Sequence, residues 1–268
     1  MDYSYFQNRV VIVTGGASGI GLATCMELAK HGARIAMLDM DQGSLENCHK
    51  TFADKGYDIL ALKCDVTNEI ACQESINQVL NRFGQIDILF NNAGITQRGL
   101  FENTEINVFK KVMDVNFFGS LYCTKAALPS LIKSKGMIIV NESIAGVAPL
   151  LGRTGYSASK HALHGMFTSL RCELHRKSVH VMIVCPGFIK TNLQTRALGS
   201  NGKIASHEQT TVGKSDTPEN VAKQIADGIV KKKSMLVLTF VGKIAYLVSR
   251  FFPLLYERIM TRQFTDEL

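Results

Sequence analysis

The chain has 268 residues, of which 46% are hydrophobic, so it is long enough to bury a complete core. No linker, low-complexity run or repeat divides it, and we predict a single domain over residues 1–268. The net charge of +7 comes without any nucleic-acid-binding motif, so we expect no nucleic-acid partner.

The first predicted element is a buried strand over residues 10–13, which leads into a glycine-rich turn and then a helical pattern. In this order, glycines allow the tight turn, let backbone amides approach a pyrophosphate and let the helix pack against the sheet. A glycine-rich turn without a ligand is the alternative. The predicted dinucleotide-binding residues of the turn are Gly15, Ser18, Gly19, Ile20 and Gly21.

A second strand over residues 35–38 ends at Asp39, eighteen positions after Gly21. A carboxylate there would accept hydrogen bonds from the ribose hydroxyls of an adenine nucleotide. Because a 2′-phosphate would repel Asp39, and the next residue is Met40 rather than Arg, the sequence favours NAD over NADP. The alternative is that Asp39 only caps the following turn.

Two more groups of candidate cofactor-binding residues come where the third and fourth predicted strands end. Asp65 and Val66 close the third strand, and Asn92, Ala93 and Gly94 close the fourth. The carboxyl ends of parallel strands meet at one edge of a sheet, so we expect both groups to face the same nucleotide.

Helical patterns alternate with the strands along the chain. This alternation predicts an α/β fold, with a parallel sheet and helices on both of its faces. The predicted helices, after the one that follows the glycine turn, cover residues 42–53, 69–82, 108–131, 155–175 and 218–230.

Tyr156 and Lys160 lie four residues apart in the helix predicted over 155–175, and therefore on one helix face. A neighbouring cation favours the phenolate, so we expect Lys160 to lower the pKa of Tyr156 towards the range where proton transfer is efficient. Without further context, a Tyr at the edge of the core and a solvated Lys would explain the same spacing.

Taken together, the glycine turn, Asn92-Ala93-Gly94 and the spacing from Tyr156 to Lys160 resemble the short-chain dehydrogenase/reductase family with the TGxxxGxG fingerprint. The resemblance implies a Rossmann-type doubly wound parallel sheet of about seven strands in the order 3-2-1-4-5-6-7. It also implies an NAD(P)-dependent oxidoreductase that interconverts a secondary alcohol and a ketone by hydride transfer.

The same resemblance implies four catalytic residues. Tyr156 would exchange the proton of the substrate, and Ser143, thirteen residues earlier, would hydrogen-bond the substrate oxygen. Lys160 would also bond the nicotinamide ribose, and Asn116 would hold a water that links Lys160 to solvent; a buried helix Asn bonded to nearby backbone is a compatible alternative. Glu142 departs from the family pattern, which often has a small hydroxyl residue there, and its carboxylate could point away or perturb the site.

After the sixth predicted strand, residues 181–184, the chain resembles the Pro-Gly segment of the family. Pro186 and Gly187 begin this segment, Ile189 would orient the nicotinamide carboxamide through its backbone, and Thr191 would contact that group or the diphosphate. Residues 190–215 are polar and lack periodicity, so we predict a substrate lid there, with a plain surface loop as the alternative.

The apolar and aromatic tail over residues 240–262 predicts a C-terminal helical extension. Lys243, Arg250 and Pro253 interrupt it, whereas a membrane-spanning helix needs roughly 20 apolar residues. Packing on its own domain, a dimer seam and peripheral contact with a membrane surface remain open. The tail loosely resembles that of the 11β-hydroxysteroid dehydrogenase-like branch, which implies a homodimer or homotetramer and a steroid-, retinoid- or lipid-like substrate.

The remaining composition bears on location and on alternatives. The seven cysteines include no CxxC pair, which predicts reduced, mostly buried thiols. The sequence shows no signal-peptide pattern, so we expect a cytoplasmic protein. The histidines are not closely spaced as metal ligands would be, so we expect no metal site. A catalytically silent nucleotide-sensing or scaffold protein is the alternative function. A nucleotide-sugar epimerase is a further one, but little chain follows Pro186 for a sugar-binding region.

Overall fold

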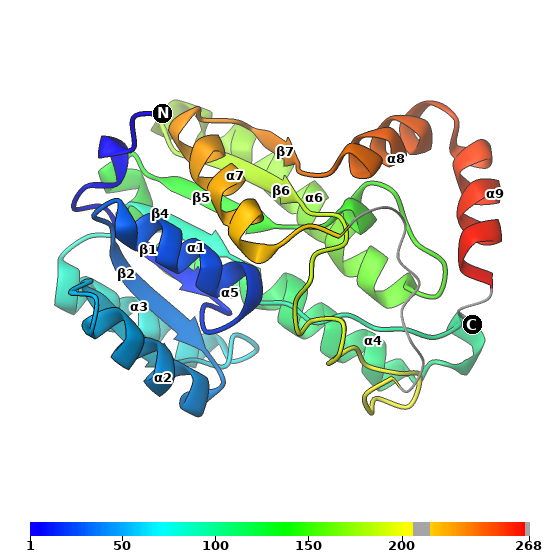
Figure 1. Cartoon of the computed structure of the whole chain (residues 1–268), viewed down its shortest axis with the longest axis horizontal. Coiled ribbons are helices and arrows are strands. Elements are labelled where there is room, and N and C mark those ends of the chain that lie inside the picture. The colour runs from blue at the N-terminus through cyan, green and yellow to red at the C-terminus, as the bar shows by residue number, and fades with distance from the viewer. Residues whose placement is uncertain (206–214, 266–268) are drawn as a thin grey trace.

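The computed structural model describes residues 1–205 and 215–265. Its centre is a parallel sheet of seven strands in the order β3-β2-β1-β4-β5-β6-β7, as predicted (Figure 1). The strands are β1 (Val10–Thr14), β2 (Arg34–Asp39), β3 (Ile59–Lys63), β4 (Ile88–Asn91), β5 (Met137–Asn141), β6 (His180–Cys185) and β7 (Met235–Val237).

Helices cover both faces of the sheet, because alternate side chains of each strand point to opposite faces. On the face of Val11 and Val13 lie α1 (Gly19–Lys30), α2 (Gln42–Ala53) and α7 (Pro218–Val230). On the face of Val10 and Ile12 lie α3 (Glu69–Phe83), α5 (Gly119–Ser134) and α6 (Thr154–Leu174). Six of the seven cysteines are buried within this architecture, as predicted, and Cys172 is exposed.

The helix predicted over residues 108–131 is not continuous. It consists of α4 (Ile106–Met113), the π-helical turn η3 (Asp114–Phe118) and α5. A π-turn adds a residue to the helical register and leaves the apolar pattern on either side intact, so periodicity could not reveal it. The other predicted helices end within two residues of the observed boundaries.

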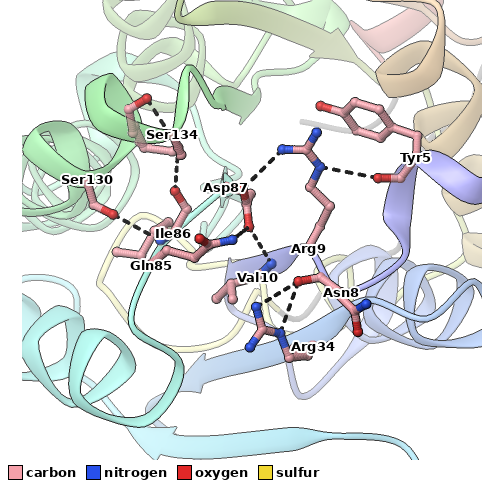
Figure 2. Close-up of polar contacts among 11 residues, drawn as sticks. Tyr5, Asn8, Arg9, Val10, Arg34, Gln85, Ile86, Asp87, Ser130 and Ser134 are labelled. Atoms are coloured by element: carbon pink, nitrogen blue, oxygen red, sulfur yellow. Dashed lines mark hydrogen bonds and ion pairs between the residues drawn. The ribbon is translucent and has the colours of Figure 1, made fainter.

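The amino edge of the sheet is held by Asp87, in the loop before β4 (Figure 2). Only 4% of this side chain is exposed, and it accepts hydrogen bonds from the Val10 amide at 2.8 Å, Arg9 Nη1 at 3.1 Å and Gln85 Nε2 at 2.8 Å. Each carboxylate oxygen therefore has a partner, which ties the start of β1 to the start of β4.

Neighbouring loops at the amino edge are paired in the same way (Figure 2). Ser130 and Ser134 of α5 bond the amide and the carbonyl of Ile86, and Arg34 donates two hydrogen bonds to the carbonyl of Asn8. This edge thus satisfies its backbone groups through its own side chains.

Two helices, α8 (Phe240–Phe251) and α9 (Pro253–Phe264), follow β7 and form the predicted C-terminal extension at the far end of the molecule (Figure 1). Pro253 begins α9, where its missing N–H costs no helical hydrogen bond. Within residues 1–205 and 215–265, no helix has the length and apolarity to cross a bilayer.

Candidate active site

A cavity of about 790 Å³ opens where the carboxyl ends of the strands meet, a size typical of cofactor and substrate sites. Of the predicted site residues, only Gly21 and Asn116 do not line it. Those that do are Gly15, Ser18, Gly19, Ile20, Asp39, Asp65, Val66, Asn92, Ala93, Gly94, Ser143, Tyr156, Lys160, Pro186, Gly187, Ile189 and Thr191.

Gly21 lies behind the cavity wall, where α1 passes very close to the glycine turn. A Cβ at this position would lie 2.2 Å from the carbonyl oxygen of Gly15 and 2.6 Å from Asn92 Nδ2. Gly15 itself has a φ of +59°, a conformation that favours glycine. Gly21 therefore allows the helix to approach the turn, and its predicted part in cofactor binding stays a prediction.

A hydrogen-bond network joins the ends of β1, β4 and β5. Thr14 Oγ1 accepts from the amides of Asn92 and Ala93 at 2.9 and 3.0 Å, and Asn92 Nδ2 donates to the carbonyls of Thr14 and Gly15 at 3.0 Å each. Asn92 Oδ1 in turn accepts from Asn141 Nδ2 at 2.9 Å. Asn141 was not predicted as a site residue, although its place at the end of β5 could have indicated that it lies at the site.

Asp39 ends β2 at the mouth of the cavity. Its carboxylate accepts hydrogen bonds from the amide of Ala17 in the glycine turn at 3.0 Å and from the amide of Asp41 at 3.1 Å. The side chain therefore caps the following turn, and it also lines the cavity, so capping is not shown to be its only role. Its predicted bond to the ribose stays a prediction.

Tyr156 and Lys160 of α6 meet Ser143 on one wall of the cavity. Tyr156 is 9% exposed and Lys160 is 4% exposed, and the side chain of Tyr156 is hydrogen-bonded to that of Ser143. Lys160 Nζ lies 5.6 Å from the centroid of the Tyr156 ring and donates a 2.8 Å hydrogen bond to the carbonyl of Asn141. The predicted phenol, hydroxyl and ammonium groups therefore do converge.

The predicted direction of the Tyr156 pKa is wrong for the protein by itself. Burial raises the pKa of Tyr156, and the hydrogen bond with Ser143 opposes this rise. Burial also lowers the pKa of Lys160 to about 8, against the opposing charge of Glu142. Removing a phenol from water disfavours its charged form, and here that effect exceeds the influence of nearby charges.

Asn116 lies in the turn η3 and is fully buried. Its amide nitrogen donates to the carbonyl of Ile95 at 3.0 Å and to Ser159 Oγ at 2.8 Å, and its amide oxygen accepts from the Ile95 amide at 2.8 Å. This confirms the interpretation of a buried helix Asn bonded to nearby backbone. Its predicted water-holding role stays a prediction.

The sequence left open whether the carboxylate of Glu142 points away from the site, and the structure shows that it points inward. Its side chain is completely buried, and Oε2 lies 3.0 Å from Nδ1 of His164, a residue of α6 that is 32% exposed. Oε1 has no hydrogen-bond partner among the described residues. His164 was not predicted, although its spacing of four residues from Lys160 places both on one helix face.

The predicted lid over 190–215 is described only in part, because residues 206–214 lie outside the described residues. Its described part pairs with neighbouring loops: the Lys190 amide bonds the carbonyl of Asp216 at 3.0 Å, and the Leu198 amide bonds that of Thr96 at 2.9 Å. Leu193 of this segment and Phe188 just before it line the cavity. Opening and closing of this segment stays a prediction.

The C-terminal helices contact the loop that follows Ser143. Ser249 Oγ donates to the carbonyl of Val147 at 3.1 Å, and the hydroxyl of Tyr256 contacts the carbonyls of Ala148 and Pro149 at 3.2 and 3.0 Å. Packing of the tail on its own domain is therefore confirmed. The dimer seam and the membrane contact remain predictions.

Comparison with known proteins gives consistent results. A family model described as short chain dehydrogenase matches residues 9–200. Dehydrogenase/reductase SDR family member 7B of Rattus norvegicus is 34% identical over 274 residues, which cover 98% of this chain and 84% of the relative. The 11-beta-hydroxysteroid dehydrogenase-like 2 protein of Arabidopsis thaliana is 38% identical over 200 residues, which cover 73% of this chain and 65% of the relative.

Solved structures share the fold. A short chain dehydrogenase/reductase from Burkholderia phymatum in complex with NAD gives a TM-score of 0.84 at 23% identity, covering 93% of this chain and 95% of that one. An alcohol dehydrogenase from Thermococcus sibiricus complexed with 5-hydroxy-NADP gives 0.73 at 23% identity, covering 87% and 96%. With the sequence matches, these findings show that the chain belongs to the short-chain dehydrogenase/reductase family of oxidoreductases.

Proposed function

We propose that the protein interconverts a secondary alcohol and a ketone by hydride transfer with NAD. The observation that carries the proposal is the convergence of Tyr156, Ser143 and Lys160 on the same cavity that Asp39 and the glycine turn line. A proton-exchanging group and a nucleotide site within one crevice are what this reaction needs.

The residues at the cavity fit a dinucleotide. The amino end of α1 has no side-chain cap, and its residues Ser18, Gly19 and Ile20 line the cavity, so its amides are available to an anionic diphosphate. Asn141 Oδ1 is buried without a hydrogen-bond partner among the described residues, at the end of the crevice where Lys160 lies. A bound nicotinamide dinucleotide would supply the hydride donor or acceptor.

The side chains of this protein would handle the proton. With its pKa raised by burial, Tyr156 holds its proton at neutral pH, the state required to protonate a forming alkoxide during reduction. Ser143 would donate a second hydrogen bond to the same oxygen, as in an oxyanion site. The bond from Lys160 to the carbonyl of Asn141 holds the ammonium group beside Tyr156.

Asp39 supports the choice of NAD, because its carboxylate is fixed by two backbone amides and would repel a 2′-phosphate. Structural neighbours include one solved with NAD and one with an NADP derivative, so they do not decide the question. Fluorescence titration with NADH and NADPH tests it, and tighter binding of the phosphorylated form would overturn the proposal.

We further propose an apolar substrate of the steroid, retinoid or lipid type. Ile144, Leu150, Phe188 and Leu193 line the cavity beside the catalytic residues. A relative is named 11-beta-hydroxysteroid dehydrogenase-like 2, which supports the same class. Turnover is expected to rise with the apolar length of a series of secondary alcohols, and an absence of any gain would remove the basis of this proposal.

The exposed side of the tail is a candidate contact surface. Either a second copy of the chain, in a homodimer or homotetramer, or a membrane surface would cover it. Its exposed large apolar side chains are Phe240, Val241, Ile244, Leu247, Phe251, Phe252, Leu254, Leu255 and Ile259. Size-exclusion chromatography and sedimentation with vesicles of phosphatidylserine and phosphatidylcholine distinguish the two coverings. A cytoplasmic location stays part of the proposal, and imaging of a tagged chain in cells tests it.

The main test is a panel of steroids, acyl derivatives and small alcohols and ketones, followed at the nicotinamide absorbance in both directions. The proposal predicts turnover of at least one secondary alcohol or ketone with NAD as cofactor. The alternative, a catalytically silent nucleotide sensor, predicts NADH binding without turnover of any compound in the panel.

A further inference from the structure

Beneath the catalytic residues lies an acid-base pair that their chemistry does not explain. Glu142 comes directly after β5, between Asn141, whose carbonyl accepts from Lys160, and Ser143. Its buried Oε2 meets His164 Nδ1 at 3.0 Å. Since Tyr156, Lys160 and His164 follow each other at intervals of four residues on α6, all three lie on the helix face towards this carboxylate.

His164 is the hydrogen-bonded partner of Glu142, and the ammonium of Lys160 also acts on this carboxylate. Its Oε1 is buried without a hydrogen-bond partner among the described residues, and a Cβ on Gly146 would lie 2.2 Å from that atom. The glycine therefore lets the turn η4 (Ile144–Gly146) close over the carboxylate. An isolated buried carboxylate is costly, so His164, which reaches towards the surface, is the partner that can bring a proton.

Other titratable groups face the pair from three elements. Lys160 and His161 of α6 act on Glu142, which in turn acts on Tyr156 and on Cys185 of β6. Arg171 of α6 and Arg250 of α8 act on His164. Hydrogen bonding to Glu142 raises the pKa of His164, and burial raises the pKa of Glu142. Both shifts keep a proton in the pair over a wider pH range than either side chain would in water.

We propose that Glu142 and His164 are a positioning pair, in which the proton on His164 sets the negative charge that Tyr156 and Lys160 experience. With His164 protonated, the pair is neutral overall. Once His164 loses its proton, the carboxylate of Glu142 disfavours the phenolate of Tyr156 and favours the ammonium of Lys160. The pair thereby couples the pH of the solvent to the proton exchange of the proposed function, on which this inference rests.

Two nearly isosteric variants are expected to act on Tyr156 in different pH ranges. Glu142→Gln removes the negative charge, so the phenolate forms at a pH lower by roughly half to one unit. His164→Gln leaves the phenolate titration in place, because burial raises the pKa of Tyr156 above its ordinary value near 10, where an imidazole has already lost its proton. At the lower pH where His164 carries its proton, His164→Gln restores the charge of Glu142 and slows oxidation on the acid limb by roughly three- to tenfold. The double variant is expected to match Glu142→Gln, because without the carboxylate the histidine has nothing to neutralise.

The readout for Glu142 does not depend on finding a substrate. The ultraviolet absorbance of the phenolate is titrated in each background and again in the same background carrying Tyr156→Phe, so that the difference reports Tyr156. The pH profile of kcat/KM then follows with whichever alcohol the panel supplies. His161→Gln is the matched control, because His161 contacts the carbonyl of Ser157 and not Glu142; its effect on the acid limb is expected to be much smaller than that of His164→Gln.

A phenolate that forms at lower pH in Glu142→Gln and in the double variant, together with slower oxidation on the acid limb in His164→Gln, supports the pair. An unchanged phenolate titration in Glu142→Gln, or an unchanged acid limb in His164→Gln, overturns it, since a merely structural role would change stability and leave both in place. Melting temperature and NADH binding show whether each variant is folded. If Glu142→Gln unfolds, His164→Gln still tests the pair, because His164 is partly exposed and its substitution should be tolerated. Failure of the panel to yield turnover counts against the proposed function, and an unchanged phenolate titration in Glu142→Gln then still overturns the pair.

Discussion

Polar side chains are buried at both edges of the sheet, but the two edges differ in whether the buried oxygens have hydrogen-bond partners. At the amino edge, each oxygen of Asp87 has a hydrogen-bond donor, and Ser130 and Ser134 satisfy the loop before β4. At the carboxyl edge, three buried oxygens at the ends of β4 and β5 have no hydrogen-bond partner among the described residues. They belong to Asn91, Asn141 and Glu142.

This difference separates stability from function. A fully paired buried network holds elements together, whereas buried polar atoms left without partners cost stability and are kept where a ligand or a reaction uses them. Substitutions at the amino edge should therefore change the free energy of unfolding and spare turnover. Substitutions of reacting polar side chains at the carboxyl edge should do the reverse.

The largest effect is expected for Tyr156→Phe, which removes the proton-exchanging hydroxyl from the carboxyl edge. Loss of general acid-base catalysis lowers kcat by roughly 10²- to 10⁴-fold. The free energy of unfolding should change by no more than about 1 kcal/mol, because only the hydrogen bond with Ser143 is lost. Steady-state kinetics measures kcat, and denaturant unfolding measures the free energy of unfolding. Unchanged turnover would show that Tyr156 does not transfer the proton.

Asp87→Ala should give the opposite pattern. It leaves the Val10 amide and Arg9 without their carboxylate, which is expected to lower the free energy of unfolding by about 2 to 3 kcal/mol while kcat of the folded protein stays the same. Asp58→Ala is the matched control: it breaks an ion pair with Arg82 of 2.8 Å whose side chains are 39% and 54% exposed, and it should cost less than about 1 kcal/mol. Equal losses in both variants would remove the special role of the amino edge.

Local patterns in the sequence predicted the glycine turn and the shared helix face of Tyr156 and Lys160, whereas the sheet order and the place of Ser143 were implied by the resemblance to the family. Glycine spacing reports a turn, and a spacing of four reports a helix face. The pairing of Glu142 with His164 was not predictable in this way, since it depends on which strand end faces α6.

The prediction that the pKa of Tyr156 is lowered was wrong for a related reason. The spacing to Lys160 describes one neighbouring charge, but the degree of burial depends on how the whole cavity wall is packed. The π-turn at Asn116 was missed because one added residue changes the register of the helix and not its apolar character.

A smaller effect is expected for Gly21→Ala, which tests the carboxyl edge without touching a reacting group. The new Cβ would lie 2.2 Å from the Gly15 carbonyl, so the turn must move and overpacking costs about 1 to 3 kcal/mol. Binding of NADH, measured by fluorescence, should weaken by about tenfold or more as the amides of α1 shift. Gly165→Ala is the matched control, because nothing lies within 4 Å of its new Cβ; it should raise stability by about 0.5 to 1 kcal/mol and leave NADH binding unchanged.

The smallest effect is expected for Tyr256→Phe, which loosens the contact between α9 and the loop after Ser143. The hydroxyl bonds the carbonyls of Ala148 and Pro149, and its removal should cost about 0.5 to 1.5 kcal/mol. Because this loop continues to Leu150, which lines the cavity, the KM for an apolar substrate should rise by up to about tenfold while kcat stays nearly constant. A matched loss of kcat would mean that the tail acts on the catalytic residues themselves and not only on the wall that holds the substrate.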